Sequence, residues 1–239
     1  MRLDKFLSSQ LPDISRRDVK KLCLKGRVTV GGAAAKRSDM HIDELHDEIA
    51  LDGVPVVYRE HIYIMLNKPQ GVVCSTRDGL SQTVLELVPD HLQRNGLFPA
   101  GRLDKDTEGF VLITDDGDLA HRMLSPAHHV PKTYFVRLEK PCEEGCENIF
   151  AQGFEDDEGG RWKPAQLRLL NESRTECELT ITEGRYHQVK RMFSQQGNRV
   201  VFLKRIAIGN LLLDDSLALG ECLEILHKDV DKLLAEKAR

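Results

Sequence analysis

The pattern of apolar residues changes near residue 58, and this change favours folds built from two separate parts. Before that point short helical patterns precede small strands, whereas strand patterns dominate after it. Residues 54–60 (Val-Pro-Val-Val-Tyr-Arg-Glu) mark the expected boundary. A chain of 239 residues is long enough for two small domains that each bury a core. We therefore predict one domain over residues 1–58 and a second domain over residues 61–239.

Two short amphipathic helices are predicted at the start of the first domain. Apolar residues recur at helical spacing over residues 3–11. For the second helix, Ser15 is a suitable N-cap, Asp18 stands where a capping box needs an acidic partner, and Gly26 ends the helix. A strand pattern then enters a glycine turn over residues 27–32. Helices followed by small strands predict an α+β module of about 55–60 residues.

The net charge of −4, taken as a bulk number, argues against a partner with a phosphate backbone. However, residues 1–37 contain ten basic and three acidic side chains, so they carry +7 and the rest of the chain carries −11. The second helix presents Arg16, Arg17, Lys20 and Lys21 on one face. Like charges four residues apart destabilise a helix, so this face favours a polyanionic partner, and a solvated surface is the alternative interpretation.

The first domain resembles the small RNA-binding module named after ribosomal protein S4. The resemblance rests on Arg2-Leu3-Asp4, Ser15-Arg16, Gly26-Arg27-Val28 and the turn at Gly31. It departs from the family in one detail, because Gly32 follows Gly31 where the family often has Asn before its turn glycine. The resemblance implies RNA binding through the second helix and the loop after it. The side chains expected to contact RNA are Arg16, Arg17, Lys20, Lys21 and Arg27.

Strand patterns outnumber helical ones in the second domain. The expected strands cover residues 61–66, 110–114, 132–138, 176–181 and 200–203. One expected helix ends at Leu124, and two others cover residues 189–196 and 229–237. Irregular spacing of these elements favours a mixed, mainly antiparallel sheet flanked by helices over a doubly wound parallel sheet. The fold class is therefore predicted as α+β.

Several classes of function lack their sequence signals. The chain has no nucleotide-binding glycine loop and no complete set of metal ligands, so we expect neither cofactor nor metal. Its six scattered cysteines are typical of free thiols in a reducing compartment. No apolar run approaches the roughly 18 residues of a membrane span, and the first seven residues carry charges where a signal peptide is apolar. We therefore expect a cytoplasmic protein that does not contact a membrane.

Polar segments of the second domain carry the functional signal. Residues 101–109 form a dense polar loop between two glycines directly before a strand, and residues 132–134 are Lys-Thr-Tyr. A turn held by local ion pairs and an ordinary strand tyrosine are the alternative interpretations. Residues 184–205 contain six basic residues and no acidic one. Such a stretch within an acidic domain indicates a phosphate-binding surface.

Together these segments resemble the RsuA family of pseudouridine synthases over nearly the whole chain. The matching motifs are Gly-Arg-Leu-Asp-x-x-Thr-x-Gly at 101–109, Gly-Arg-Tyr-His-Gln-Val-Lys-Arg-Met at 184–192 and Asn-Lys-Pro-x-Gly at 67–71. The match is close to the member that modifies uridine 516 of 16S ribosomal RNA. The resemblance therefore implies conversion of this uridine to pseudouridine, with small-subunit rRNA in an assembly intermediate as the partner.

The resemblance also implies roles for individual residues. Asp104 acts on the ribose, either by attacking the anomeric carbon or by taking the 2′ proton while the base departs. Lys190 pairs with Asp104 and favours its charged form. Tyr134 packs on the uracil and assists loss of the C5 proton, and Arg102 fills the gap left by the flipped base. The expected phosphate contacts are Arg185 and Arg191.

Three other functions stay open from the sequence. One is a synthase of the same family that modifies large-subunit rRNA. Another is a non-catalytic RNA-binding protein with an S4-type module, and the third is a carboxylate-driven hydrolase of nucleosides. Because one active site is built within one chain, we expect a monomer.

Overall fold

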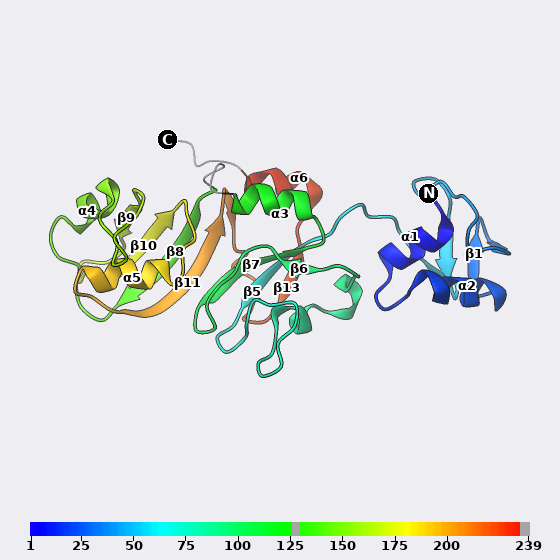
Figure 1. Ribbon diagram of the computed structural model, residues 1–239, viewed down its shortest axis with the longest axis horizontal. Coiled ribbons are helices and arrows are strands. Elements are labelled where there is room, and N and C mark those ends of the chain that lie inside the picture. The colour runs from blue at the N-terminus through cyan, green and yellow to red at the C-terminus, as the bar shows by residue number, and fades with distance from the viewer. Residues whose placement is uncertain (126–129, 235–239) are drawn as a thin grey trace. The chain divides into compact units, whose positions relative to one another are not determined.

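The computed structural model describes residues 1–125 and 130–234 of the chain. The chain divides into two compact units, which consist of Met1–Ile62 with Pro89–Leu97 and of Tyr63–Val88 with Phe98–Arg239. Their elements can be followed in Figure 1. Both units combine helices with mainly antiparallel sheets, which confirms the predicted α+β class.

The first unit packs two helices and a small sheet around one core. The helices are α1 (Leu3–Gln10) and α2 (Arg16–Leu24). An antiparallel sheet in the order β2-β1-β3-β4 contains β1 (Val28–Val30), β2 (Ala33–Ala34), β3 (Ile49–Leu51) and β4 (Val54–Pro55). Ser15 accepts a hydrogen bond from the backbone of Asp18, whose side chain accepts one from the backbone of Ser15. The predicted capping box is therefore confirmed.

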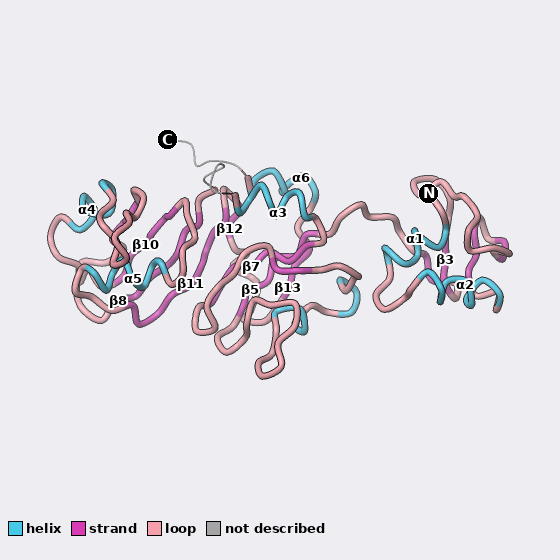
Figure 2. Tube along the Cα trace, in the orientation of Figure 1, coloured by secondary structure: helices cyan, strands magenta, loops and turns pink. Residues whose placement is uncertain are grey.

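Within the described residues, the second unit is built on a nine-stranded sheet in the order β13-β5-β7-β11-β8-β10-β9, with β12 beside β11 and β6 beside β7. Its strands are β5 (Tyr63–Lys68), β6 (Phe98–Pro99), β7 (Glu108–Thr114), β8 (Lys132–Leu138), β9 (Gln166–Leu169), β10 (Glu176–Ile181), β11 (Val200–Ile208), β12 (Leu211–Leu212) and β13 (Cys222–Glu224). Among the described strands, β7 and β11 pair in parallel and the other pairs are antiparallel. The strands run side by side in Figure 2.

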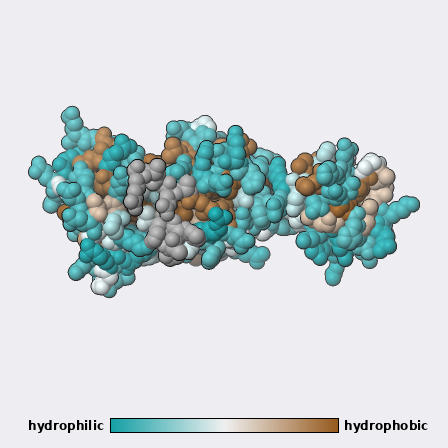
Figure 3. All heavy atoms as spheres, turned by 90° about the horizontal axis from the view of Figure 1, so that it is seen from above, coloured by the Kyte–Doolittle hydropathy of each residue, from teal (hydrophilic) through white to brown (hydrophobic). Residues whose placement is uncertain are grey.

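Helices cover the sheet of the second unit. They are α3 (Gly117–Leu124), α4 (Cys146–Gln152), α5 (Gln188–Gln195) and α6 (His227–Val230), with 3-10 turns η1 (Val84–Leu87) and η3 (Asp231–Leu233); the 3-10 turn η2 (Asp90–Leu92) belongs to the first unit. Helices α3 and α6 share one apolar core with β5 and β7, whereas α4 packs on β9 and α5 on β11 (Figure 1). No helix in the described ranges has the length and apolarity to cross a membrane. Hydrophilic residues dominate the face drawn in Figure 3.

Strand β11 and the last helix differ from the sequence-based expectation, and β5 lies two residues later than expected. Strand β11 continues to Ile208, five residues beyond the expected end, because the buried guanidinium of Arg205 donates to backbone carbonyls and can therefore lie inside the sheet. The helix expected over 229–237 is shorter. It occupies His227–Val230 and gives way to η3, whose Lys232 carbonyl accepts from the backbone of Asn210. Residues 235–237 of that expected helix lie outside the described part of the chain.

Candidate active site

The loop that carries Asp104 rests on a buried lysine. Lys68, at the end of β5, has no exposed surface, and its ammonium donates to the carbonyls of Pro69, Asp104, Lys105 and Thr107 at 2.8–3.4 Å. Burial lowers the pKa of Lys68, although nearby acidic groups oppose this shift. Because four carbonyls converge on one cation, the backbone of this loop is fixed beneath Asp104.

A glycine allows the strand after this loop to reach the sheet. Gly109 in β7 has a φ of +103°, and a side-chain Cβ there would lie 2.2 Å from the Arg205 carbonyl of β11. No residue larger than glycine fits this approach. Arg205 itself donates from Nε to Phe110 O at 2.7 Å and from Nη1 to Arg102 O at 3.5 Å. The two strands and the start of the loop are therefore joined by one buried guanidinium.

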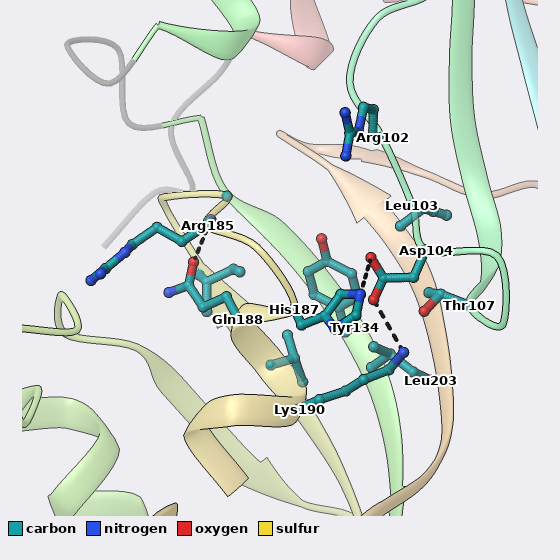
Figure 4. A pocket seen from close by; sticks show the side chains of 13 residues that line it. Arg102, Leu103, Asp104, Thr107, Tyr134, Arg185, His187, Gln188, Lys190 and Leu203 are labelled. Carbon is teal, nitrogen blue, oxygen red and sulfur yellow. Dashed lines mark hydrogen bonds and ion pairs between the residues drawn. The ribbon is translucent and has the colours of Figure 1, made fainter. Parts of the chain in front are cut away.

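The opposite wall of the site is the turn that precedes α5. The side chain of Gln188 accepts from the backbone of Arg185 at 3.1 Å and donates to Glu183 at 2.6 Å, which fixes this turn. His187 has a φ of +49° at the helix N-cap and stacks on Tyr186 with the ring centres 3.8 Å apart. A positive φ is strained for a residue with a side chain. With this backbone conformation, the His187 ring points toward the Asp104 loop (Figure 4).

Asp104 lies between two basic side chains of the α5 region, as Figure 4 shows. Lys190 Nζ is 3.1 Å from Asp104 Oδ2, and His187 Nε2 is 3.5 Å from Asp104 Oδ1. Lys190 also reaches Asp106 Oδ1 at 2.6 Å. Asp104 keeps 28% of its side chain exposed, so it is accessible from solvent while it is paired. The structure thus brings together the predicted Asp104 and Lys190, with the Tyr134 ring beside them (Figure 4).

The charges in this cluster stabilise one another. Burial alone would lower the pKa of Lys190, but its hydrogen bonds to Asp106 and Asp104 outweigh burial and raise it. The hydrogen bond from Lys190 also lowers the pKa of Asp106. Lys190 therefore carries a positive charge beside Asp104 at neutral pH.

A cavity of about 620 Å³ opens beside this cluster. Its lining residues include Arg102, Asp104, Lys132, Tyr134, Arg185 and Arg205. Tyr134 is 8% exposed and Lys132 is 9% exposed, so both belong to the inner wall, whereas the Arg102 side chain is exposed at the entrance. A cavity of this size accommodates a flipped nucleotide.

The predicted phosphate contacts Arg185 and Arg191 have carboxylate partners within the chain. Arg185 pairs with the buried Asp156, and Arg191 pairs with Asp157 and with Glu158 at 2.9 Å. Both guanidinium groups also lie over the ring of the buried Trp162, at 4.5 and 5.1 Å from its centre. Their role in binding phosphate stays a prediction, and it requires RNA to displace these carboxylates.

The predicted RNA-contacting side chains of the first unit are all exposed. Arg27 forms a bidentate pair with Asp52, and Lys21 pairs with Asp18 at 3.0 Å. For Arg16, Arg17 and Lys20, no ion pair is found within the described residues. These three cations of α2 therefore face water.

Sequence reasoning gave no role to two residues that the geometry places at the site. His187 and Lys68 lie within the motifs at 184–192 and 67–71, but a motif does not show which groups its side chains contact. Their contacts with the Asp104 loop arise from chain segments far apart in the sequence. Within the described residues, no group of three or more His, Cys, Asp or Glu side chains is arranged to hold a metal ion.

Comparison with known proteins identifies the family of the chain. A family model for RNA pseudouridylate synthase matches residues 62–195, and one for the S4 domain matches residues 1–49. The chain is 45% identical over 235 residues to "Uncharacterized RNA pseudouridine synthase YtzG" of Bacillus subtilis, covering 98% of each. It is 47% identical over 223 residues to "Ribosomal small subunit pseudouridine synthase A" of Yersinia pestis, covering 92% of this chain and 93% of that protein.

A solved structure supports the same conclusion. The crystal structure of a pseudouridylate synthase is 40% identical, aligns with a TM-score of 0.68, and covers 98% of this chain and 99% of that chain. These matches define an RNA-modifying isomerase. The chain belongs to the RsuA family of pseudouridine synthases, with an S4 domain ahead of the synthase domain. This confirms the predicted family and enzyme class.

Proposed function

We propose that this enzyme converts one uridine of small-subunit (16S) ribosomal RNA to pseudouridine, at position 516, and that Asp104 acts on the ribose. One observation carries the proposal. Asp104 stands at a cavity large enough for a nucleotide, held 3.1 Å from Lys190 and close to His187. The name of the Yersinia pestis relative, which is 47% identical, supports small-subunit rRNA as the substrate.

The geometry supports the proposal at several steps of the reaction. A uridine must leave the RNA stack before its glycosidic bond becomes accessible. In the cavity, its ribose lies against Asp104, whose carboxylate is held beside Lys190 and His187. The carboxylate attacks the anomeric carbon or takes the 2′ proton, and the uracil then rejoins the ribose through C5. The ring of Tyr134 packs against the uracil, and exposed Arg102 occupies the gap in the RNA.

We further propose a division of labour between residues 1–58 and residues 61–239. The first part binds RNA through the exposed cations of α2, and the second part performs the isomerisation. A whole active site within the second part supports function as a monomer. Free rRNA and a small-subunit assembly intermediate are the two forms of substrate to compare, and the cytoplasm is where both would be met.

Mapping pseudouridines in rRNA from cells with and without this protein tests the proposal. Loss of pseudouridine at a single 16S position, restored by the wild-type chain, is the expected result. An Asp104→Asn variant should bind RNA normally but fail to restore the modification, since an amide cannot supply the carboxylate chemistry. Asp118→Asn makes the same chemical change on an exposed residue of α3 and should restore it fully.

Other outcomes point to the remaining candidates. A pseudouridine lost from large-subunit rRNA would replace the proposed substrate. Free uracil released from RNA would indicate a hydrolase. Full modification by Asp104→Asn would show that another group acts on the ribose.

A further inference from the structure

A lysine on the inner wall of the cavity has no role in the reaction described above. Lys132 begins β8, two residues before Tyr134, and strand periodicity therefore places both side chains on one face. Arg205 of β11 lies directly across from Tyr134 in the antiparallel register. Cross-strand neighbours share a face, so Lys132, Tyr134 and Arg205 converge on the same cavity, which all three line.

The charge of Lys132 is not compensated within the described part of the chain. Its residue is 9% exposed, and its ammonium has no hydrogen bond or ion pair with another described residue. The charged group that acts on it is Arg205, another cation. Burial and, to a lesser extent, Arg205 lower the pKa of Lys132 to about 8. A buried cation is costly unless it is paired, and this one faces a cavity where a ligand can supply the partner.

We propose that Lys132 is a further catalytic residue: its ammonium binds a carbonyl oxygen of the target uracil and stabilises the negative charge that the base acquires when its bond to ribose breaks. This inference rests on the proposed function, since it needs uridine in this cavity. Cytosine presents an amino group where uracil has one of its carbonyls, so a donor at O4 would also favour uridine over cytidine.

The step balances without any additional reactant. The N1–C1′ bond breaks, and its electron pair stays with the base, where the charge spreads over N1 and the carbonyl oxygens. After the base turns, C5 bonds to C1′, the C5 proton leaves and N1 gains a proton. Lys132 donates a hydrogen bond throughout and keeps its own proton. A fixed donor in a cavity with little water stabilises developing charge more strongly than water does.

The test measures catalysis and binding separately in the full-length protein. The RNA is a 16S rRNA transcript with tritium at uridine C5, so that tritium release reports loss of the C5 proton. With enzyme in excess, Lys132→Met should slow release by about 10²- to 10³-fold, as expected for loss of one donor to developing charge. Filter binding should show an RNA affinity within about threefold of the wild type, because one contact among many is lost.

The matched control is Lys140→Met, which removes the same charge from an exposed position just beyond β8 and should leave release unchanged. Release by Lys132→Met within about threefold of the wild type would overturn the inference, and so would an equal loss of rate and affinity. A wild-type protein that releases no tritium from any rRNA would instead contradict the proposed function.

A change in the substrate identifies the contact itself. RNA fragments with 2-thiouridine or 4-thiouridine at the target replace one carbonyl oxygen by sulfur, a weaker acceptor. Sulfur at the contacted position should slow the wild-type enzyme and should slow Lys132→Met no further, since that variant has already lost the interaction. Equal slowing of both enzymes, or no slowing of the wild type by either sulfur, would overturn the inference.

Discussion

The chain contains two basic segments that look alike in sequence and differ in the folded protein. In the first, residues 1–37, the α2 cations Arg16, Arg17 and Lys20 are exposed and have no ion pair among the described residues. In the second, residues 184–205, nearly every cation is matched. Five of its six basic side chains bind a carboxylate or a backbone carbonyl, namely Lys190, Arg185, Arg191, Arg199 and Arg205.

The difference shows that a basic stretch of sequence is not the same as a basic surface. Cations of the second segment bind the carboxylates of residues 156–158 and of the Asp104 loop, which come from distant parts of the chain. These cations are paired with carboxylates of the same chain, whereas the cations of α2 remain available to a partner. We therefore expect changes in the second segment to affect rate and stability, and changes on α2 to affect affinity and its dependence on salt.

The largest effect is expected at Lys68, which belongs to the site although it lies in neither basic segment. Lys68→Met keeps the length of the side chain and removes the donor shared by four carbonyls beneath Asp104. A shift of the loop by about 1 Å would lower the rate at saturating RNA by roughly 10²- to 10³-fold. RNA affinity should be unchanged, because α2 is untouched. Single-turnover tritium release and filter binding measure the two quantities.

A lysine of the same loop provides the control for this variant. Lys105 is exposed, and its ammonium binds Ser81 Oγ at 2.9 Å, away from Asp104. Lys105→Met should therefore keep a rate within about twofold of the wild type. If Lys105→Met and Lys68→Met lose activity equally, the loop does not depend on the buried ammonium.

A second prediction concerns the stability of the Lys132→Met variant. This variant should be slower than the wild type in catalysis but more stable. A fall in the pKa of Lys132 from 10.5 to about 8 corresponds to about 3 kcal/mol of cost for burying its charge. Below pH 8 the folded and unfolded states both hold the proton, so the full cost is present. Between pH 8 and 10.5 the folded state releases the proton first, and stability rises with pH.

The Lys132→Met variant lacks this cost at every pH. Its free energy of unfolding should exceed that of the wild type by up to about 3 kcal/mol at pH 7, and the difference should shrink toward pH 10. Urea denaturation at both pH values measures the difference. A constant offset, or a variant less stable than the wild type at pH 7, would show that the ammonium is not held at a cost.

Local patterns were sufficient to predict several elements of the fold. The alternation over residues 132–138 predicted β8 with its observed bounds, and Ser15 with Asp18 predicted the N-terminus of α2. Both depend on residues close together in the sequence. The end of β11 was missed because Arg205 looks too polar for a strand interior until its carbonyl partners are known.

The site was predictable only in part for the same reason. The motifs identified Asp104, Tyr134 and Lys190, which the fold brings together. They did not show that Arg191 would face acidic residues, since Asp157 is 34 residues away. A motif specifies residue types and spacing, whereas the partners of a charged side chain depend on the tertiary fold. A count of charges could therefore not show that Arg185 and Arg191 each bind a carboxylate of the same chain.

A third prediction concerns the α2 surface and is smaller. Replacing Arg16, Arg17 and Lys20 together by Gln should weaken RNA binding by about 10- to 30-fold in moderate salt. The slope of log affinity against log salt should fall in magnitude by about 2, because a protein that makes fewer phosphate contacts releases fewer counterions when it binds. The rate at saturating RNA should stay unchanged. Filter binding across a salt series, with tritium release at saturation, checks both results.

Three exposed cations of the second unit provide a control with the same change in charge. They are Lys140, Arg168 and Lys228. Their joint replacement by Gln should leave the salt slope nearly unchanged, because they do not lie on α2. An equal fall in slope for both triple variants would mean that overall charge, and not the α2 face, attracts RNA.

The smallest effect on binding is expected at Arg191, and it tests the comparison most directly. Arg17→Gln should lower the salt slope by about 0.7 to 0.9, as for one phosphate contact, whereas Arg191→Gln should leave it nearly unchanged. Arg191→Gln should instead lower the Tm, because Asp157 loses its partner and Trp162 loses the guanidinium over its ring. A slope that falls equally in both variants would mean that RNA displaces the carboxylates and takes Arg191 from them. The paired cations of the second segment would then exchange their carboxylates for phosphates when RNA binds, and the two basic segments would differ only in the free protein.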